Sequence, residues 1–451
     1  MIVALAFAIR SLTANFIRGH LDDASWFQSI SYAVFDRQAQ AILDHQQPLF
    51  WIPDSTRTDL IQHPPAYPIW VALIYWTNGE RSPVPVQRVQ LLLDSLLVLL
   101  LVGVAVTAFG WRVGLIAGAA ASLSPLLAIA GATPGADAPA SWLVLAGVWA
   151  LLLAFKRQST VYAIAAGGLL GLACWIRVNP LFLFLPWMIA LWCCVAASWQ
   201  RRFCLSVAVA LSTLLVISPV IIRNLVIFYP QIAPTGLNIG LNLWEGIGET
   251  NRGPEFDAPS DDVGVIAAER REMGLSADAP LGLNYPDGIR RDRERGRKAL
   301  AVIKANPIWY TGTIAKRVWG HLKFAGAPAP HVGTTGINVT SKRCLPPDRQ
   351  HGPVAILVNV LGAIQSVLRY LALPLMLLGI AMALRRQWRI TCLLLATVLY
   401  YLLTVGVGHS EIRYGLPMQE LLFVFAAVTI DWSLGRFRVS RKSSPRARSL
   451  A

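Results

Sequence analysis

Residues 21–26 read Leu21-Asp22-Asp23-Ala24-Ser25-Trp26 and follow the apolar segment 1–18, so two adjacent carboxylates stand where the chain leaves a bilayer. Acids are poor lipid anchors at such a boundary, because a carboxylate is costly in hydrocarbon and has only a short stem. Asp22 and Asp23 are therefore candidate catalytic residues. The alternative is that both are solvated and cap the segment 24–43, whose apolar residues recur at helical spacing.

A proline-rich turn follows in the same loop, at His63-Pro64-Pro65-Ala66-Tyr67-Pro68. Proline lacks a backbone N–H and restricts the residue before it, so we expect no helix here but an extended, stiff turn. A stiff turn would hold His63 at a fixed place relative to Asp22 and Asp23. An apolar run begins directly after it.

The composition excludes a soluble globular protein. Of the 451 residues, 55% are hydrophobic and only 14% are charged, and the mean hydropathy is +0.50. These values are typical of a polytopic membrane protein. The formal net charge of +15 does not require nucleic acid as a partner, because membrane proteins concentrate Lys and Arg in cytoplasmic loops. The six cysteines show no disulfide or zinc spacing.

The apolar segments predict an all-α membrane protein with about ten transmembrane helices, since a span needs roughly 20 apolar residues. Basic residues cluster between alternate segments, at 111–112, 156–157, 201–202 and 385–389, and again in the tail. Such clusters mark the cytoplasmic side, which would then hold both termini. The expected spans are 1–18, 89–109, 112–131, 138–155, 160–176, 180–198, 203–222, 360–384, 389–407 and 415–433.

Four regions follow from this arrangement. The first, 1–222, is an N-terminal transmembrane module that includes a first outer loop at 19–88. The second, 223–352, is a large extracytoplasmic loop that contains juxtamembrane helices. The third, 353–433, holds the C-terminal transmembrane helices, and the fourth, 434–451, is a basic cytoplasmic tail.

The predicted topology places the polar features of the chain on the outer face. Convergence of many ionisable groups on one surface is a stronger signal than any single motif. Taken alone, Asp137 fits a helix N-terminal acid and Arg177 fits a headgroup anchor. The converging features are Asp22, Asp23, His63, Asp137, Arg177, Arg223, Asn224 and the turn 409–414.

Several of these stretches resemble the GT-C glycosyltransferases, in particular the family of dolichyl-phosphate-mannose protein mannosyltransferases, which use polyprenyl-phosphate sugars. The acid pair and the His-Pro-Pro-x-Tyr-Pro turn are similar to the family's first outer loop. Further similarities lie at 219–224, at 238–243 and at Arg413-Tyr414-x-x-Pro417. Trp26 stands where the family usually has Tyr. Asp23 stands where it has Glu, which leaves open which carboxylate is the base.

The resemblance implies a set of site residues by position. Asp137 matches an acid of the family's second outer loop, and Arg177 matches a counter-charge near a phosphate. The Gly/Asn stretch 234–246 offers amide hydrogen bonds to a sugar or phosphate, or is an ordinary turn. The implied catalytic residues are Asp22, Asp23 and Asp137, and the implied substrate-binding residues are His63, Tyr67, Arg177, Arg223, Asn224, Asn238, Asn242, Arg413 and Tyr414.

The resemblance further implies an inverting glycosyltransferase with an Asp base that uses no metal and no cofactor. Its expected partners are a polyprenyl-phosphate-linked sugar donor, the lipid bilayer and an acceptor glycan, lipid or protein, and no nucleic acid. We expect a multi-pass protein of the bacterial inner (plasma) membrane with its site on the periplasmic, extracytoplasmic side.

Two other functions are open. One is a transporter or flippase of a lipid-linked or anionic substrate, which would also use charges at the membrane boundary. The other is a non-catalytic scaffold, against which the acid pair argues. We find no internal repeat of the kind that many transporters show, and the outer loops 19–88 and 223–352 are large for a carrier. An enzyme is therefore favoured.

Overall fold

A computed structural model describes residues 1–18, 29–44, 63–233, 236, 238–276, 278–284, 287–322, 352–409 and 411–435. The helices within these ranges confirm the predicted all-α class. The elements of the central bundle are α1 (Ile2–Arg18), α5 (Pro83–Phe109), α6 (Trp111–Leu123), α7 (Pro125–Ala132), α8 (Asp137–Arg157), α9 (Thr160–Ile176), η1 (Leu181–Leu183), α10 (Phe184–Cys194), α11 (Trp199–Phe228), α16 (Pro353–Val407), η3 (Ile412–Gly415) and α17 (Leu416–Ser433). The elements beside the bundle are α2 (Ser29–Leu43), α4 (Ala66–Asn78), α12 (Ile239–Gly248), η2 (Gly253–Phe256), α13 (Asp262–Glu272), α14 (Gly288–Ala305) and α15 (Pro307–Leu322).

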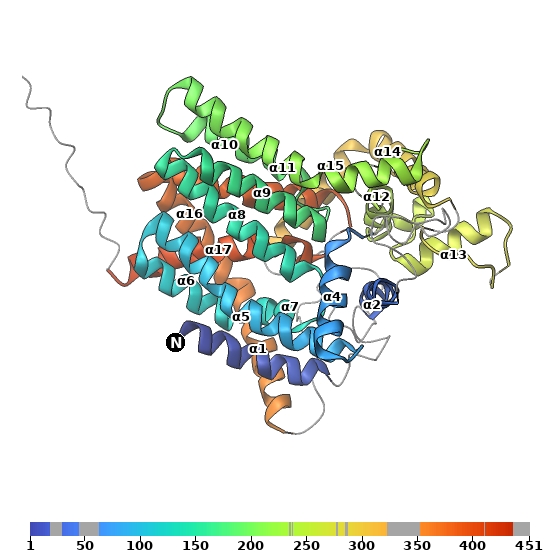
Figure 1. The fold of residues 1–451 in the computed structure, drawn as a ribbon, viewed down its shortest axis with the longest axis horizontal. Coiled ribbons are helices and arrows are strands. Elements are labelled where there is room, and N and C mark those ends of the chain that lie inside the picture. The colour runs from blue at the N-terminus through green and yellow to red at the C-terminus, as the bar shows by residue number, and fades with distance from the viewer. Residues whose placement is uncertain are drawn as a thin grey trace, which may run out of the picture.

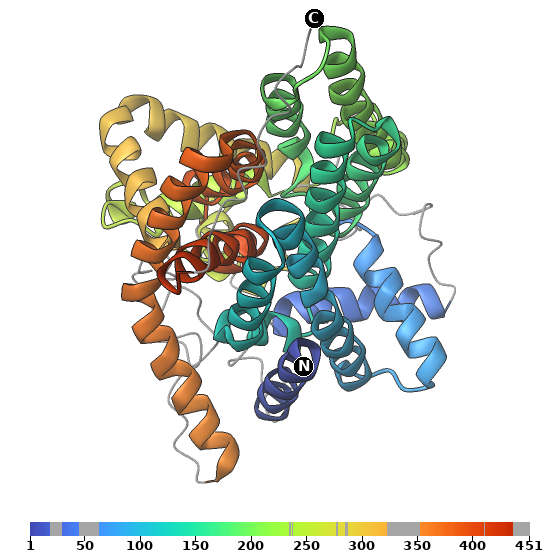
Figure 2. The same cartoon turned by 90° about the vertical axis from the view of Figure 1, so that its left-hand side faces the viewer.

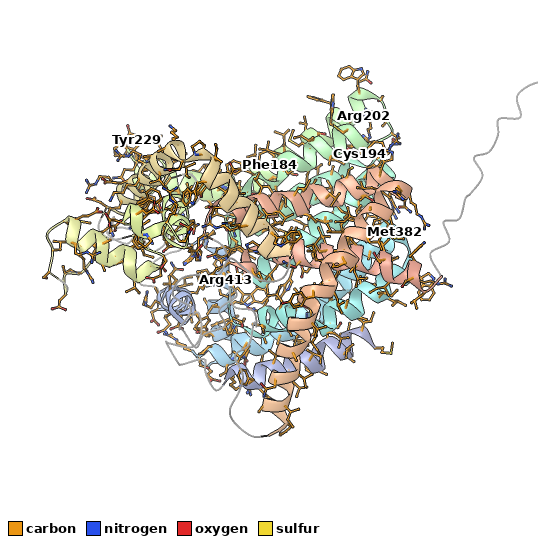
Figure 3. All side chains as sticks on the ribbon, turned by 180° about the vertical axis from the view of Figure 1, so that it is seen from behind. Phe184, Cys194, Arg202, Tyr229, Met382 and Arg413 are labelled. Atoms are coloured by element: carbon orange, nitrogen blue, oxygen red, sulfur yellow. The ribbon has the colours of Figure 1, made fainter. Side chains whose placement is uncertain are left out.

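The helices beside the bundle, named the outer helices below, gather at one end of it. In Figure 1 the bundle fills the left part of the molecule, and α2, α4, α12, α13 and α14 lie to its right. Figure 3, seen from behind, places Cys194, Arg202 and Met382 at the far end of the bundle, and Tyr229 on the side of the outer helices. Arg413 lies between the two parts. The region formed by the outer helices and the basic pair 201–202 thus lie at opposite ends of the molecule.

Several helices have the length and composition of membrane spans, so the chain is an integral membrane protein. Within the described ranges, four helical segments are long and apolar enough to cross a membrane, namely α5, α8, α11 and the part of α16 from Tyr370 to Val407. They become five if α6 and α7, bent by 65°, form one span. The elements α1, α9, η1 with α10, and α17 coincide with other expected spans but are shorter or less apolar. The count of about ten spans stays a prediction.

Two breaks in the bundle have local causes. The bend between α6 and α7 lies at Ser124-Pro125, where proline removes a helical N–H and the Ser124 hydroxyl accepts a hydrogen bond from the Leu127 amide instead (3.4 Å). The expected spans 360–384 and 389–407 form one element, α16, interrupted at Gln387 by non-helical backbone (φ −142°, ψ 53°). The first part of α16 projects away from the other helices (Figure 2).

The expectation of no helix in the proline-rich turn is wrong from Ala66 onward. The turn is limited to residues 63–65, and α4 begins at Ala66 with Pro65 at its N-cap. Pro68 falls in the first turn of α4, where a backbone N–H would have no partner within the helix. Proline is therefore tolerated there, and its fixed φ suits the start of a helix.

One attachment of the outer helices to the bundle runs through α12, beside those of α4 to α5 and of α15 to α16. The amide of His409, just after α16, donates a hydrogen bond to the Asn242 carbonyl (2.7 Å). A Cβ on Gly246 would lie 2.8 Å from the carbonyl carbon of Gly408, so only glycine allows this approach. The two parts of the molecule consequently meet at the residues that lead into η3.

Candidate functional site

Asp137 is the carboxylate on which two of the predicted arginines converge. It is the first residue of α8, and its Oδ1 lies 2.5 Å from Nη2 of Arg177, which follows the end of α9. Its Oδ2 lies 3.9 Å from Nη1 of Arg413 in η3. The three side chains are only 13 to 16% exposed, so little water screens these charges. Three loops at one end of the bundle thereby contribute to one charged centre.

The aromatic ring of Tyr414 contacts both arginines. The Cζ atom of Arg177 is 5.4 Å from the centroid of the Tyr414 ring, and that of Arg413 is 5.1 Å from it. A cation over an aromatic face gains about 0.5 to 2 kcal/mol, more where water is excluded. Tyr414 therefore stabilises both cations, and Asp137 supplies the opposite charge near each of them.

His63 and Tyr67 border the same centre from the first outer loop. Their rings pack on Phe35 of α2, with centroids 4.7 Å and 4.8 Å away. The Tyr67 hydroxyl donates a hydrogen bond to Gln90 Oε1 (3.2 Å), which ties α4 to α5. Burial, and then the positive charges of Arg177 and Arg413, lower the pKa of His63 to about 3. His63 is accordingly neutral at physiological pH.

We predict that His63 makes the protein acid-sensitive. The unfolded chain binds a proton on this histidine near pH 6.5, whereas the folded protein does so only near pH 3. Stability from neutral His63 is thus present above pH 6.5 and is lost as the pH falls from 6.5 towards 3. The Tm of His63→Gln in detergent should fall less steeply between pH 6.5 and 4 than that of the unchanged protein.

His409→Gln is the control, because the sign is opposite there. Burial disfavours the charged imidazolium of His409, but Glu249 and Glu411 outweigh burial and raise its pKa well above the usual value. Its contribution is present below pH 6.5 and is lost as the pH rises through the raised pKa. Parallel pH profiles for the two variants would contradict the His63 prediction.

A chain of alternating charges extends the centre towards the outer helices. Arg413 pairs through its Nε with Glu411, and Glu411 Oε1 lies 3.1 Å from His409 Nε2. His409 Nδ1 lies 2.6 Å from Glu249 Oε1, and Glu249 Oε2 lies 3.6 Å from Nη2 of Arg317 on α15. Burial opposes ionisation of Glu411, but Arg413 and then His409 outweigh it and lower its pKa to about 2. Glu411 and His409 therefore stay charged through the physiological range.

Four charged residues of this chain were not among the predicted site residues, namely Glu411, His409, Glu249 and Arg317. His409 and Glu411 stand in the outer turn that carries Arg413, and Glu249 follows the Gly/Asn stretch. The signal that could have singled them out was the number of opposite charges within two short segments. Their pairing with one another depends on the packing of α12 and α15 against the end of α16.

The remaining predicted residues either make other contacts or lie outside the described ranges. Arg223, near the end of α11, donates from Nε and Nη2 to Asn224 Oδ1 (2.9 and 2.7 Å). Asn238 precedes α12 in a left-handed conformation (φ 84°), which asparagine tolerates. Asn242 contributes its carbonyl to His409, as described above. Asp22 and Asp23, with Trp26, lie outside the described residues.

The structure brings together six of the predicted residues, and it shows no metal cluster in the parts of the chain that it describes. The six are His63, Tyr67, Asp137, Arg177, Arg413 and Tyr414. Among the described residues, no group of three or more His, Cys, Asp or Glu side chains is arranged to hold a metal ion. The expectation that the protein uses no metal stays a prediction.

Comparison with known proteins agrees with the resemblance seen in the sequence. Residues 62–222 match the family model described as dolichyl-phosphate-mannose-protein mannosyltransferase. The predicted resemblance to this family is confirmed over this range. The range contains His63, Tyr67, Asp137 and Arg177, whose roles stay predictions. No curated protein matches the chain.

Solved structures of an archaeal oligosaccharyltransferase share the fold at low sequence identity. The oligosaccharyltransferase AglB from Archaeoglobus fulgidus, in complex with an inhibitory peptide and a dolichol-phosphate, is similar with a TM-score of 0.51 and 13% identity, over 96% of this chain and 50% of that chain. Its apo form gives a TM-score of 0.50 and 13% identity, over 96% and 51%. ArnT from Cupriavidus metallidurans bound to undecaprenyl phosphate gives 0.39 and 15%, over 96% and 78%. This chain spans about half the length of the archaeal structures, and its fold is GT-C-like.

Proposed function

We propose that this protein is a membrane glycosyltransferase that moves a sugar from a polyprenyl-phosphate-linked donor to an acceptor hydroxyl on the extracytoplasmic face. The observation that carries the proposal is the convergence of Arg177 and Arg413 on Asp137 at the end of the bundle. Two guanidinium groups near one carboxylate, at the ends of membrane helices, suit a phosphate on a lipid tail. The match of residues 62–222 to a family of glycosyltransferases supports the same reading.

Arg177 has an N–H donor that is available for a phosphate. A guanidinium carries five N–H donors, and the Nε of Arg177 has no hydrogen-bond partner among the residues that the structure describes. Asp137 and Glu411 hold the two arginines in place before the donor arrives. AglB, which has the same fold, has been solved with a dolichol-phosphate, and a lipid phosphate is the leaving group of the proposed reaction.

The proposed reaction is a single displacement. The acceptor oxygen forms a bond to the anomeric carbon, and the bond from that carbon to the phosphate oxygen breaks, so the anomeric centre is inverted. The acceptor proton passes to a carboxylate base, which we assign to the Asp22–Asp23 pair, and the polyprenyl phosphate leaves with its charge stabilised by Arg177 and Arg413. Asp137 is already engaged by two arginines, so its proposed role is to orient them.

The other assignments follow from this scheme. Asn238 and Asn242 would donate amide hydrogen bonds to sugar hydroxyls, Arg223 with Asn224 would add a cationic contact for the lipid phosphate, and His63 and Tyr67 would border the donor. The acceptor is a glycan, lipid or protein hydroxyl. With the basic clusters in the cytoplasm, the site would face the periplasm across the bacterial inner membrane.

The proposal is tested by following the sugar. Proteoliposomes that contain the protein are incubated with polyprenyl-phosphate hexoses and pentoses that are radiolabelled in the sugar, together with a cell-envelope extract as the acceptor source. We expect label in a product that is not the donor and an equal amount of released polyprenyl phosphate. A transporter would instead move the intact donor across the bilayer, and label found only in the intact donor would overturn the proposal.

A further inference from the structure

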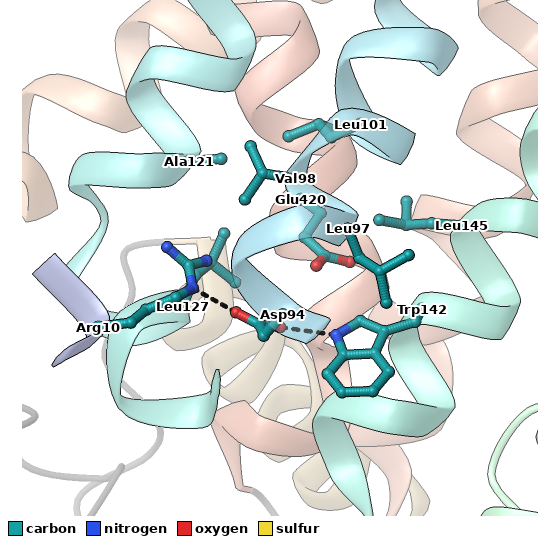
Figure 4. A pocket seen from close by; sticks show the side chains of 10 residues that line it. All are labelled: Arg10, Asp94, Leu97, Val98, Leu101, Ala121, Leu127, Trp142, Leu145 and Glu420. Carbon is teal, nitrogen blue, oxygen red and sulfur yellow. Dashed lines mark hydrogen bonds and ion pairs between the residues drawn. The ribbon is translucent and has the colours of Figure 1, made fainter. Parts of the chain in front are cut away.

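A buried polar network lies inside the bundle, apart from the charged centre. Asp94 of α5 accepts a hydrogen bond from Arg10 Nε of α1 at its Oδ2, and another from the Trp142 indole N–H of α8 at its Oδ1 (2.6 Å). Next to it, the Ser141 hydroxyl of α8 donates to Glu420 Oε2 of α17 (2.5 Å). Figure 4 shows Arg10, Asp94, Trp142 and Glu420 around one small cavity with apolar walls.

Two members of the network, Ser141 of α8 and Glu420 of α17, lie one to two helical turns below the charged centre. Ser141 stands four residues after Asp137, which is about one turn of α8. Glu420 stands seven residues after Arg413. Arg413 lies in η3, which leads directly into α17. The bond from Ser141 to Glu420 therefore joins the two elements that bring Asp137 and Arg413 together.

The backbone of α7 also packs against the side chain of Asp94. Arg10 is 1% exposed and Asp94 is 8% exposed. A Cβ on Gly131 of α7 would lie 2.2 Å from Asp94 Oδ2, so the backbone of α7 is pressed against the carboxylate. With α1, α7 and α8 around it, Asp94 can accept its two hydrogen bonds in only one arrangement of these helices.

Directional bonds of this kind determine how far one helix can slide along another. Apolar contacts between helices are non-directional and tolerate small shifts, whereas a hydrogen bond near 2.6 Å weakens steeply when its atoms move apart. A shift of α8 by one residue would be about 1.5 Å along its axis. Such a shift would break both bonds of α8 and would change the distance between Asp137 and the two arginines.

We propose that Asp94 and Glu420 are positioning residues, which set the axial register of α8 and α17 and thereby hold Asp137 and Arg413 at the distance that the transfer reaction needs. The inference rests on the proposed function for its effect on turnover. Its structural part, the control of register, does not depend on which reaction the site performs.

The first test compares two tryptophans of the same helix. Trp142→Phe keeps an aromatic ring but removes the N–H that bonds Asp94. The matched control is Trp149→Phe, because the Trp149 N–H donates to Thr107 Oγ1 (2.9 Å) two turns farther from the site. A small misplacement of reacting groups costs up to about 10²-fold in rate, so we expect kcat to fall roughly 10-fold or more in Trp142→Phe. We expect little change in the donor KM, and near-normal turnover in Trp149→Phe.

A conservative pair separates hydrogen bonding from simple space filling. Glu420→Gln keeps an oxygen that can accept from Ser141, whereas Glu420→Leu fills similar space without one. Turnover should survive in the first variant and fall in the second. Equal turnover in both, or equal loss in Trp142→Phe and Trp149→Phe, would overturn the positioning role. Asp94→Asn leaves Arg10 without a counter-charge and can prevent folding, so it is not the variant of choice.

The second test does not use activity. Hydrogen exchange of backbone amides is measured by mass spectrometry in the first turn of α8 and in residues 411–416. Loss of one buried hydrogen bond is worth about a factor of five in a local opening equilibrium, so exchange there should be about fivefold faster in Trp142→Phe than in Trp149→Phe. Unchanged exchange would overturn the inference even if turnover falls. Faster exchange in a protein that transfers no sugar would instead support the inference and reject the proposed function.

Discussion

Asp22→Asn is expected to lower turnover by roughly 10²-fold or more while the amount of folded protein stays nearly the same. The change keeps the size of the side chain and removes the charge with which it would take the acceptor proton. Side chains of adjacent residues point about 100° apart on a helix and to opposite faces on a strand, so we expect only one of Asp22 and Asp23 to act as the base. We favour Asp22 because it aligns with the first acid of the family's pair. The measurement is single-turnover transfer of labelled sugar.

Two further variants serve as the control for Asp22→Asn and as the test of the neighbouring carboxylate. Asp44→Asn is the matched control, because Asp44 is an acid of the same outer region that forms an exposed ion pair with Arg81 (2.7 Å), and such a pair contributes little. Asp23→Asn tests the neighbour. Normal turnover in Asp22→Asn with an inactive Asp23→Asn would transfer the role of base to Asp23. Normal turnover in both would remove the catalytic reading of this loop and favour a transporter.

Replacement of Arg413 by lysine is expected to weaken binding of a polyprenyl phosphate by roughly 10 to 100-fold, because a charge-assisted hydrogen bond contributes about 1.5 to 3 kcal/mol. Lysine keeps the positive charge that Glu411 and Asp137 require, but it loses the planar fork that can bind two phosphate oxygens at once. Alanine is less informative, since it leaves the buried Glu411 without its main partner. We expect a similar loss in Arg177→Lys.

A ligand without a phosphate and a control variant show whether the loss of affinity is specific to the phosphate and to the site. Binding of the corresponding polyprenyl alcohol, which lacks the phosphate, should be the same in all variants. Arg157→Lys is the matched control, because Arg157 also lies over a tyrosine ring, that of Tyr162 (5.2 Å), but at the other end of α8. Arg223→Ala extends the test to the third predicted arginine. Normal phosphate affinity after replacement of all three arginines would reject the phosphate site.

The fold class could be predicted because it follows from local properties of the chain. A run of about 20 apolar residues must bury its backbone hydrogen bonds within itself in a bilayer, so its length and composition indicate a helix without reference to the rest of the chain. Helix ends were less predictable. The start of α4 at Ala66 and the break of α16 at Gln387 depend on which backbone groups find partners in the packed structure.

Part of the candidate site could also be predicted. Asp137, Arg177 and Arg413 are charged residues beside long apolar segments, where charge is costly unless it has a use. The partners Glu411, His409, Glu249 and Arg317 could not be paired from the sequence, since each contact joins different elements. Arg10, Asp94 and Glu420 stand inside apolar segments, and only their mutual contacts indicate a role.

Hydropathy and charge act residue by residue, so the all-α membrane class, a polar region at one end of the bundle and most of the residues gathered there could be predicted without the structure. The pairing of the charges, in contrast, depends on how the helices pack in three dimensions. Ser141 and Glu420 are separated by 279 positions and Arg10 and Asp94 by 84, and such contacts arise from the packing of whole helices against one another. Their distances, and hence the arrangement of Asp137 with Arg413, are properties of that packing and not of any single segment.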